Sequence, residues 1–270
     1  MKGVVANQPQ WRLTAEEIAG ALDGALVAGQ GAEPLGPVSI DTRTLDEGDL
    51  FFAVRGERFD GHDFVDRAVE RGARGVVVSD RARIPAVTPD RTVVLVVHDT
   101  VNALQALARH VRRASGARVV AITGSAGKTS TKEIVAALLA AQFRVVRNRG
   151  NLNNHIGLPL SLMALLERPD VAVMELGMNH AGEIARLVSV AEPDVRMWIN
   201  VGDAHLGFFG TVDQVADAKA EIMHGATSDG VLIANADDAR VMARARRFPG
   251  RIVTFGIRQP ADVRATEVRD

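Results

Sequence analysis

Short apolar runs alternate with polar segments over the first hundred residues of the chain, which has 270 residues. The pattern Thr14–Glu17 is typical of a capping box, and apolar residues follow it at helical spacing at Ile18, Leu22 and Leu26. A short helix is therefore predicted to start here. The remaining signals in this part predict a helix over residues 64–71, a turn over residues 88–90, and strands over residues 38–40, 50–54, 75–78 and 92–97. We expect a small mixed α/β domain over residues 1–98.

The pattern changes after residue 98. A helix is predicted over residues 99–113, and Ser115 and Gly116 then precede Arg118–Ile122, a continuous apolar run typical of a buried parallel strand. Further along, strands are predicted near residues 144, 171–175, 196–201, 231–234, 252–255 and 261–268, and helices near residues 129–141, 182–190, 212–224 and 237–246. This alternation indicates βαβ units on a doubly wound, mostly parallel sheet over residues 99–270.

Composition and charge narrow the class of protein. The chain contains no Cys, which removes disulfides and thiolate metal sites and fits a reducing compartment. It carries 32 Lys and Arg against 33 Asp and Glu, so no overall charge attracts it to nucleic acid. No apolar run approaches the roughly 20 residues that span a bilayer, and residues 1–11 lack the apolar core of a signal peptide. We expect a cytoplasmic protein with no nucleic-acid partner and no membrane insertion.

A glycine-rich segment with a lysine directly follows the apolar run 118–122. Main-chain N–H groups of such a loop surround phosphate oxygens at a helix N-terminus, the lysine faces the β- and γ-phosphates, and a hydroxyl is offered to Mg²⁺. The longer phosphate-loop pattern has a glycine where this chain has Ile122, so the match is to the shorter form G-x-x-G-K-[ST]. We therefore predict a P-loop ATPase-like domain, with these residues in the loop: Gly124, Ser125, Ala126, Gly127, Lys128, Thr129 and Ser130.

Polar residues follow two further predicted strands. Glu175 ends the run 171–175, and ligands of open α/β sheets lie beyond the carboxyl ends of the strands. With a phosphate loop at the same edge, Glu175 is predicted to bind Mg²⁺ through a carboxylate oxygen. His205 follows the strand at 196–201 in the same way, although a single histidine is more often structural than a ligand. Lys219 lies in the next helix and would by itself be expected in solvent.

Asparagines crowd the segment between the phosphate loop and Glu175. Four of them, at positions 148, 151, 153 and 154, fall within seven residues. Their amides are suited either to a polar ligand or to an Asx-rich turn, and the sequence leaves both interpretations open.

Together these segments resemble the Mur ligases, and the resemblance extends over nearly the whole chain. It implies a uridine-nucleotide-binding domain at the N-terminus, because the segments Gly48–Gly56 and Asp60–Phe64 look like that domain of the family. The phosphate loop is similar to the ATP loop of the family, which also accounts for the missing glycine. Where this chain has His155, the family often has an acidic residue, so the role of that position stays open. The resemblance implies substrate binding by Ser39, Asp41, Thr42, Arg43, Asn153 and Asn154.

The same resemblance implies the cofactors. ATP is bound by the loop, and Asn235, in a segment similar to the one that the family places beside adenine, completes the site. A lysine at the position of Lys219 is carbamylated in relatives, which converts its ammonium into a carboxylate-like ligand for magnesium. Two Mg²⁺ ions are expected, with ligands from Thr129, Glu175, His205 and the carbamylated Lys219. Catalytic roles are implied for Lys128, Glu175, His205 and Lys219.

The implied activity belongs to the synthesis of peptidoglycan precursors. An ATP-dependent ligase, expected to be a monomer, would add D-Ala-D-Ala to UDP-MurNAc-tripeptide through an acyl phosphate. The alternatives are the related ligase that adds the third amino acid and a non-ligase P-loop nucleotide-binding module. Enzymes that this chain resembles continue into a C-terminal ligase domain absent from these 270 residues, so we expect the chain alone to be inactive.

Overall fold

The computed structural model describes residues 12–56, 58–84, 91–204 and 206–268, and the side chain of residue 206 is left aside. Two compact units are present. The first comprises the described residues up to Leu107 together with Leu166–Arg168, and the second comprises Ala108–Leu165 and the described residues from Pro169 onward. The turn predicted at residues 88–90 and the predicted ligand His205 lie outside the described residues. Among the helices in the described ranges, none combines the length and the apolar character needed to cross a membrane.

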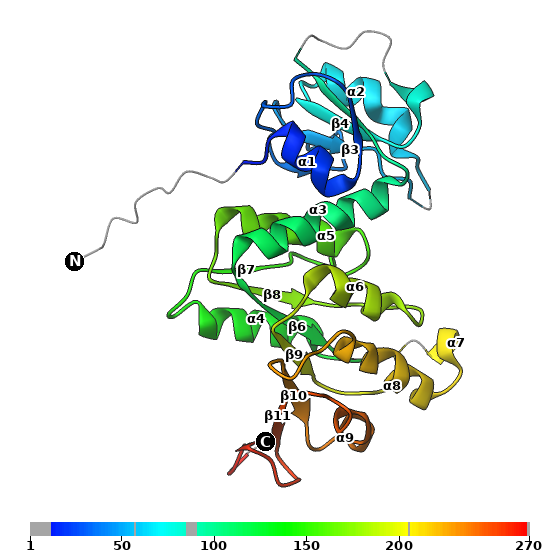
Figure 1. Ribbon diagram of the computed structural model, residues 1–270. Helices are drawn as coiled ribbons and strands as arrows, with labels where there is room; N and C mark the ends of the chain where they lie inside the picture. The colour runs from blue at the N-terminus through cyan, green and yellow to red at the C-terminus, as the bar shows by residue number, and fades with distance from the viewer. Residues whose placement is uncertain (1–11, 57, 85–90, 205, 269–270) are drawn as a thin grey trace, which may run out of the picture. The chain divides into compact units, whose positions relative to one another are not determined.

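The first unit contains a five-stranded sheet in the order β1-β5-β4-β3-β2 (Figure 1). Strand β1 runs antiparallel to β5, and the other neighbouring strands are parallel, so the predicted mixed α/β character is confirmed. Its core includes Phe51, Val65 and Val76. The elements are α1 (Ala15–Leu22), β1 (Ala25–Ala28), β2 (Val38–Ser39), β3 (Leu50–Phe52), η1 (Gly61–Phe64), α2 (Val65–Glu70), β4 (Gly75–Val78), η2 (Arg81–Arg83) and β5 (Val93–Val96).

Helix α1 confirms the predicted capping box but not the predicted length. The Thr14 hydroxyl accepts a hydrogen bond from the Glu17 main chain, and the Glu17 carboxylate accepts one from the Thr14 main chain. The prediction that Leu26 belongs to this helix is wrong. Asp23 adopts a left-handed conformation with φ 50° and ends the helix, and Leu26 pairs with Leu95 in the sheet. The apolar spacing was compatible with both structures, and sheet pairing decides between them.

The second unit contains a seven-stranded sheet in the order β12-β11-β10-β9-β6-β8-β7, and all neighbouring strands are parallel. From β6 the chain runs to the edge strand β7, returns to β8 beside β6, and then continues on the other side of β6 through β9 to β12, so the predicted doubly wound, mostly parallel sheet is confirmed. The last strand is much shorter than the predicted run 261–268. The strands are β6 (Arg118–Thr123), β7 (Val145–Arg147), β8 (Val171–Glu175), β9 (Val195–Trp198), β10 (Val231–Asn235), β11 (Arg251–Gly256) and β12 (Val263–Arg264).

Helices lie on both faces of this sheet, with α4 on one side and α6, α8 and α9 on the other (Figure 1). Helix α4 packs on β6, β7 and β8. Within this unit, α6, α8 and α9 form a continuous layer in which α6 contacts β6 and α9 contacts β10. The helices are α3 (Thr100–Ser115), which begins in the first unit, α4 (Lys128–Leu139), α5 (Gly157–Leu162), η3 (Met163–Glu167), α6 (Glu183–Ala191), α7 (Leu206–Phe209), α8 (Val212–Ala220), η4 (Glu221–Met223) and α9 (Ala239–Ala245).

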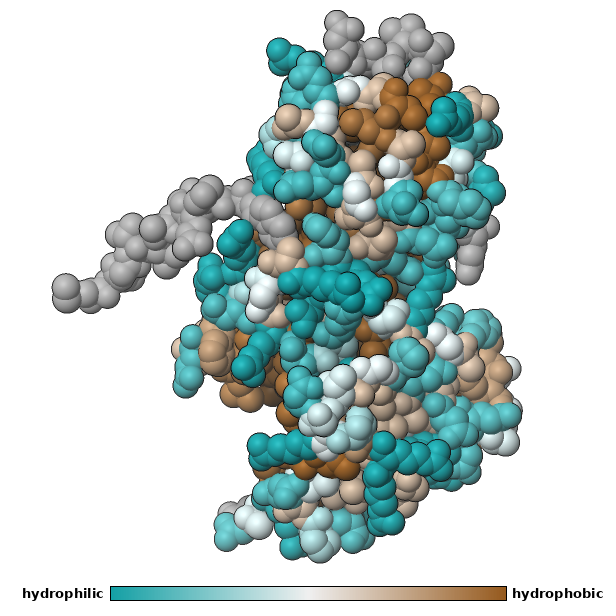
Figure 2. All heavy atoms as spheres, viewed as in Figure 1, coloured by the Kyte–Doolittle hydropathy of each residue, from teal (hydrophilic) through white to brown (hydrophobic). Residues whose placement is uncertain are grey.

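The outer face of α4 is apolar. Ile134 and Leu138 are one helical turn apart and are 60% and 72% exposed. Brown spheres gather over this helix in Figure 2. The opposite face of α4 places Ala136 in a core with Val120, Ile122 and Val173, which fixes the direction in which the phosphate-loop end of the helix points.

Candidate functional site

The predicted phosphate loop connects the end of β6 to the start of α4. Gly127 stands at the N-cap of α4 with φ 77°, a conformation that favours glycine. At Gly124 a Cβ atom would lie 2.3 Å from Ile199 Cγ1, so any side chain here would force Ile199 to move. Both glycines of the short pattern therefore occupy positions that disfavour a side chain. Ala126, Gly127, Thr129 and Ser130 are exposed, which leaves this helix N-terminus open to a ligand.

Asn200, directly beyond β9, holds the loop in place. Its Oδ1 accepts hydrogen bonds from the main-chain N–H groups of Ser125 at 2.9 Å and Ala126 at 3.0 Å. Its Nδ2 donates to the Ala126 carbonyl at 3.0 Å. The Ser125 hydroxyl adds a further connection by accepting from the Gly202 N–H at 2.8 Å. No role was predicted for Asn200, which lies inside the strand predicted over residues 196–201, whereas the observed strand ends at Trp198.

Two lysines lie close to this loop. The Lys128 ammonium donates to the Gly124 carbonyl at 2.9 Å, and burial lowers its pKa against the opposing charge of Glu175. Lys219 is only 1% exposed, so the interpretation of this residue as solvated is wrong. Burial, and then the nearby charge of Lys128, lower the pKa of Lys219 to about 8. About one tenth of Lys219 is therefore neutral at pH 7.

Glu175 is 3% exposed and ends β8, as predicted. Its Oε2 accepts a hydrogen bond from the Thr129 hydroxyl at 2.7 Å, and its Oε1 accepts one from the Asn153 amide at 2.8 Å. The structure therefore brings together Thr129 of the loop, Glu175 and Asn153. Asn154 behaves differently, because its Oδ1 accepts from the main chain of Ile156 and Gly157 and forms an Asx-type turn. The asparagine segment thus contains an Asx-type turn and an amide that contacts Glu175, and its binding of a polar ligand stays a prediction.

Asn235 and Asp238 connect the ends of β9 and β10. The Asn235 amide donates to the Ile199 carbonyl at 2.9 Å. Asp238 caps α9 and also accepts from the Val201 main chain at 2.7 Å. These contacts fix the chain segment that leads from β9 toward His205, although His205 itself is not among the described residues.

The four residues expected to bind uridine nucleotide lie at the end of β2 and in the turn that follows it in the first unit. The Ser39 hydroxyl accepts from the Asp41 main chain at 3.3 Å, and Thr42 is buried. Asp41 accepts hydrogen bonds from the side chain and main chain of Arg43, which lower its pKa to about 2. The Arg43 side chain remains 80% exposed. The turn is thus rigid and presents a guanidinium to solvent.

Asp60, His62 and Ser79 in the same unit are arranged like the acid, base and nucleophile of a catalytic triad. His62 Nδ1 lies 2.6 Å from Asp60 Oδ1, and Nε2 lies 3.1 Å from Ser79 Oγ. However, Nε2 also accepts the Ser79 main-chain N–H at 2.9 Å, which occupies the lone pair that a general base would need. His62 is 5% exposed. This group therefore serves to join the end of β4 to η1.

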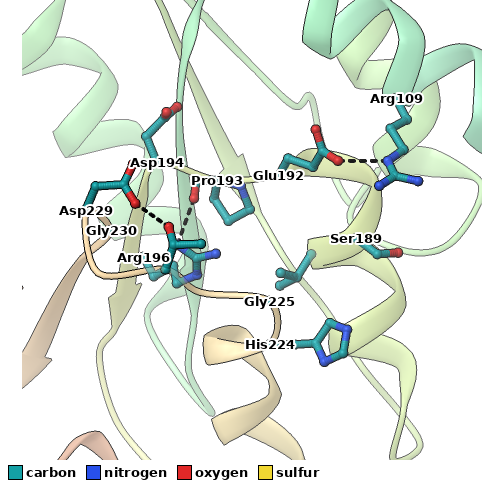
Figure 3. A pocket seen from close by; sticks show the side chains of 12 residues that line it. Arg109, Ser189, Glu192, Pro193, Asp194, Arg196, His224, Gly225, Asp229 and Gly230 are labelled. Atoms are coloured by element: carbon teal, nitrogen blue, oxygen red, sulfur yellow. Dashed lines mark hydrogen bonds and ion pairs between the residues drawn. The ribbon is translucent and has the colours of Figure 1, made fainter. Parts of the chain in front are cut away.

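A cavity of about 410 Å³ opens at the amino ends of β9 and β10 (Figure 3). Arg196 lines it, 5% exposed, and donates to the carbonyls of Ile222 at 3.0 Å and Pro193 at 2.8 Å. Glu192 at its rim is paired with Arg109 at 2.8 Å. The phosphate loop and Glu175 lie at the carboxyl ends of the strands, so this cavity is separate from the candidate site.

Comparisons with known proteins place the chain among ligases. A family model described as the Mur ligase middle domain matches residues 122–270, and one described as the Mur ligase family catalytic domain matches residues 36–112. The UDP-N-acetylmuramoyl-tripeptide–D-alanyl-D-alanine ligase of Escherichia coli is 45% identical over 227 residues, which cover 84% of this chain and 48% of that protein. The enzyme of the same name from Bacillus subtilis is 43% identical over 201 residues, 74% of this chain and 43% of the relative.

Solved structures agree with these matches. A MurF from Acinetobacter baumannii superimposes with a TM-score of 0.87 at 35% identity, covering 97% of this chain and 57% of the other. MurF from Thermotoga maritima in complex with ADP gives a TM-score of 0.73 at 35% identity, covering 83% of this chain and 51% of the other. The chain spans about half the length of the relatives that it matches. Since one family model alone covers more than half of its residues, the chain belongs to the Mur ligase family.

Proposed function

We propose that the chain carries the substrate-binding and ATP-binding parts of a ligase that adds D-Ala-D-Ala to UDP-MurNAc-tripeptide in the cytoplasm. The observation that carries this proposal is the 2.7 Å contact between Thr129 and Glu175, which joins a phosphate loop to a buried carboxylate. Relatives bearing the name of that activity are 35% to 45% identical to this chain. Residues 1–98 would bind the uridine nucleotide and residues 99–270 would bind ATP, with the chain as a monomer.

The phosphates of ATP fit the N-terminus of α4. Main-chain N–H groups in the first turn of a helix have no acceptor within the helix, and phosphate oxygens can supply one. Lys128 already lies in the loop and would exchange the Gly124 carbonyl for an oxygen of the β- or γ-phosphate. Asn235, at the end of β10, is proposed to lie beside the adenine.

The donor atoms at this site also fit magnesium, which prefers oxygen ligands. Thr129 and Glu175 would hold one ion, whose charge offsets that of the phosphates during transfer. Glu175, His205 and Lys219 would hold a second ion once Lys219 is carbamylated. Only a neutral amine adds CO₂, and the pKa of about 8 makes Lys219 suited to that reaction.

The reaction would proceed in two transfers. The terminal carboxylate of UDP-MurNAc-tripeptide attacks the γ-phosphorus of ATP and displaces ADP, which leaves an acyl phosphate. The amine of D-Ala-D-Ala then attacks the acyl carbon, releases phosphate and loses a proton to give the amide. The chain contributes positioning and charge: Lys128 stabilises the transferring phosphoryl group, and Asn153 orients Glu175.

On the substrate side, the exposed Arg43 guanidinium suits the diphosphate of the uridine nucleotide, with Ser39, Asp41 and Thr42 shaping its turn. In the second unit, a cavity of about 190 Å³ is lined by Asn154, His155, Gly177 and Arg186, among others. This cavity lies beside the Asn153–Glu175 contact, so it suits the peptide end that carries the reacting carboxylate.

Calorimetry of the 270-residue chain tests the proposal. We expect binding of ADP with Mg²⁺ and of UDP-MurNAc-tripeptide. Failure to bind either nucleotide would refute the proposal. Tighter binding of UDP-MurNAc-dipeptide than of the tripeptide would instead favour the ligase that adds the third amino acid.

A further inference from the structure

Two buried polar residues next to the candidate site have no part in the chemistry proposed above. Lys132 is 1% exposed and Asn148 is 0% exposed. Lys132 lies one helical turn after Thr129 on α4, so both side chains leave the helix on the same side. The Lys132 ammonium donates to the Asn148 carbonyl at 2.8 Å. The second turn of the phosphate-loop helix is thereby connected to Asn148, the residue that follows β7.

The Asn148 amide holds the main chain of Glu175 from both sides. Its Oδ1 accepts the Glu175 N–H at 3.0 Å, and its Nδ2 donates to the Glu175 carbonyl at 3.1 Å. Strand β7 pairs with β8 only as far as Arg147 opposite Val173. Asn148 therefore replaces the missing strand pairing with its side chain, at the position where the metal-binding carboxylate is attached.

The same amide also fixes the asparagine segment. The second N–H of Nδ2 donates to the Leu152 carbonyl at 3.0 Å. Leu152 immediately precedes Asn153, whose own amide contacts Glu175 Oε1 at 2.8 Å. The Asn148 side chain thus fixes the main chain of Glu175 directly. It also fixes the Glu175 carboxylate indirectly, because it holds Leu152 next to Asn153, which contacts that carboxylate.

The positive charge of Lys132 is paired with Glu133 and not with the Glu175 carboxylate. Lys132 lies 3.2 Å from Glu133, and Glu133 in turn pairs with Arg147 at 2.6 Å. Lys132 therefore donates to Asn148 without requiring the Glu175 carboxylate as its counter-charge.

We propose that Asn148, held by Lys132, is a positioning residue for the divalent cation bound at Thr129 and Glu175. The inference rests on the proposed function, since it concerns the nucleotide-associated cation. Hydrogen-bond partners behind a metal ligand commonly contribute 10- to 100-fold to metal affinity. Loss of the Asn148 amide should lower cation affinity by about that factor, because Glu175 loses both its main-chain anchor and its Asn153 contact.

The test compares cation binding with nucleotide binding in the 270-residue chain. Asn148→Leu keeps the approximate shape of the side chain and removes its donors and acceptor, and Lys132→Met removes the ammonium at similar length. Gln142→Leu is the matched control, because Gln142 is an exposed amide just beyond α4. Mn²⁺ affinity is measured by electron paramagnetic resonance at saturating ADP, and ADP affinity is measured by calorimetry in EDTA. Thermal unfolding without ligand monitors the fold.

We expect both site variants to bind Mn²⁺ about 10- to 100-fold more weakly, with ADP affinity in EDTA within about twofold of the unaltered chain. In the double variant the losses should not add, because the two residues act through one another. The inference is overturned if Mn²⁺ affinity is unchanged, if ADP affinity in EDTA falls equally, or if neither single variant folds, since the role is then structural. If the unaltered chain binds no ADP with Mn²⁺, the proposed function itself fails.

Discussion

Raising the pH from 7 to 9 should switch Lys219 from mostly charged to mostly neutral. With a pKa of about 8, the neutral fraction is about one tenth at pH 7, one half at pH 8 and nine tenths at pH 9. An exposed lysine with a pKa near 10.4 is neutral about 200-fold less often at pH 7. The difference follows from burial first and from the charge of Lys128 second.

Carbamate formation consumes the neutral amine and CO₂ and releases a proton. At constant dissolved CO₂, the amount of carbamate on Lys219 should therefore rise by at least the ninefold increase in neutral amine between pH 7 and pH 9, as long as occupancy stays low. The chain offers a simple background, because its lysines are Lys2, Lys128, Lys132 and Lys219.

The assay is ¹³C NMR of the chain with ¹³CO₂, ADP and Mg²⁺ at constant dissolved CO₂. Subtracting the spectrum of Lys219→Arg removes signals from the α-amino group and the other lysines. The subtraction should leave one carbamate resonance that grows with pH and with Mg²⁺. No resonance at pH 9 in this difference spectrum would refute the reasoning from burial to carbamylation.

Three further predictions concern the same site. Lys128→Ala removes a charged hydrogen-bond donor worth roughly 1.5–3 kcal/mol, so calorimetry should show ADP binding weakened about 10- to 100-fold, while UDP-MurNAc-tripeptide binding is unchanged. Asn200→Leu removes three loop hydrogen bonds at roughly 1 kcal/mol each and should weaken ADP binding by up to about 150-fold; binding within threefold of the unaltered chain would contradict the role of this amide. Lys219→Met removes a buried ammonium. Burial of this charge lowers the free energy of unfolding in full below the folded-state pKa of about 8, and the loss disappears as the pH rises toward the higher pKa of the unfolded state. In CO₂-free buffer the substitution should therefore raise the unfolding temperature by calorimetry more at pH 7 than at pH 9.5, and an equal effect at both would refute the burial argument.

The sheet of the second unit was predictable because its central strands are continuous apolar runs with no competing periodicity. Val119 to Ile122 and Val171 to Met174 are buried on both faces, as those runs indicate. Strand β1 was not predictable in the same way. Its residues are exposed or half-buried, and the spacing of Leu26 after Leu22 suited a helix until sheet pairing with β5 decided otherwise.

The loop and Glu175 were found from sequence because each combines a residue type with a position at a strand end. Asn148, Asn200 and Lys132 were missed because their partners are mainly main-chain atoms 16 to 75 residues away. An amide that binds a main chain leaves no complementary residue type in the sequence. Such residues become visible only when the strands are placed side by side.

Lys219 illustrates a signal that was present but unused. As a single residue it was assigned to solvent, since lysines are mostly exposed. The buried positions of α8 are Val215, Ala216, Ala218 and Lys219, so Lys219 follows Val215 at the i+4 spacing of the buried face. A lysine on the apolar face of an amphipathic helix must have either a buried partner or a lowered pKa. The pKa of Lys219, lowered to about 8 by burial and by the neighbouring charge of Lys128, agrees with the second of these alternatives.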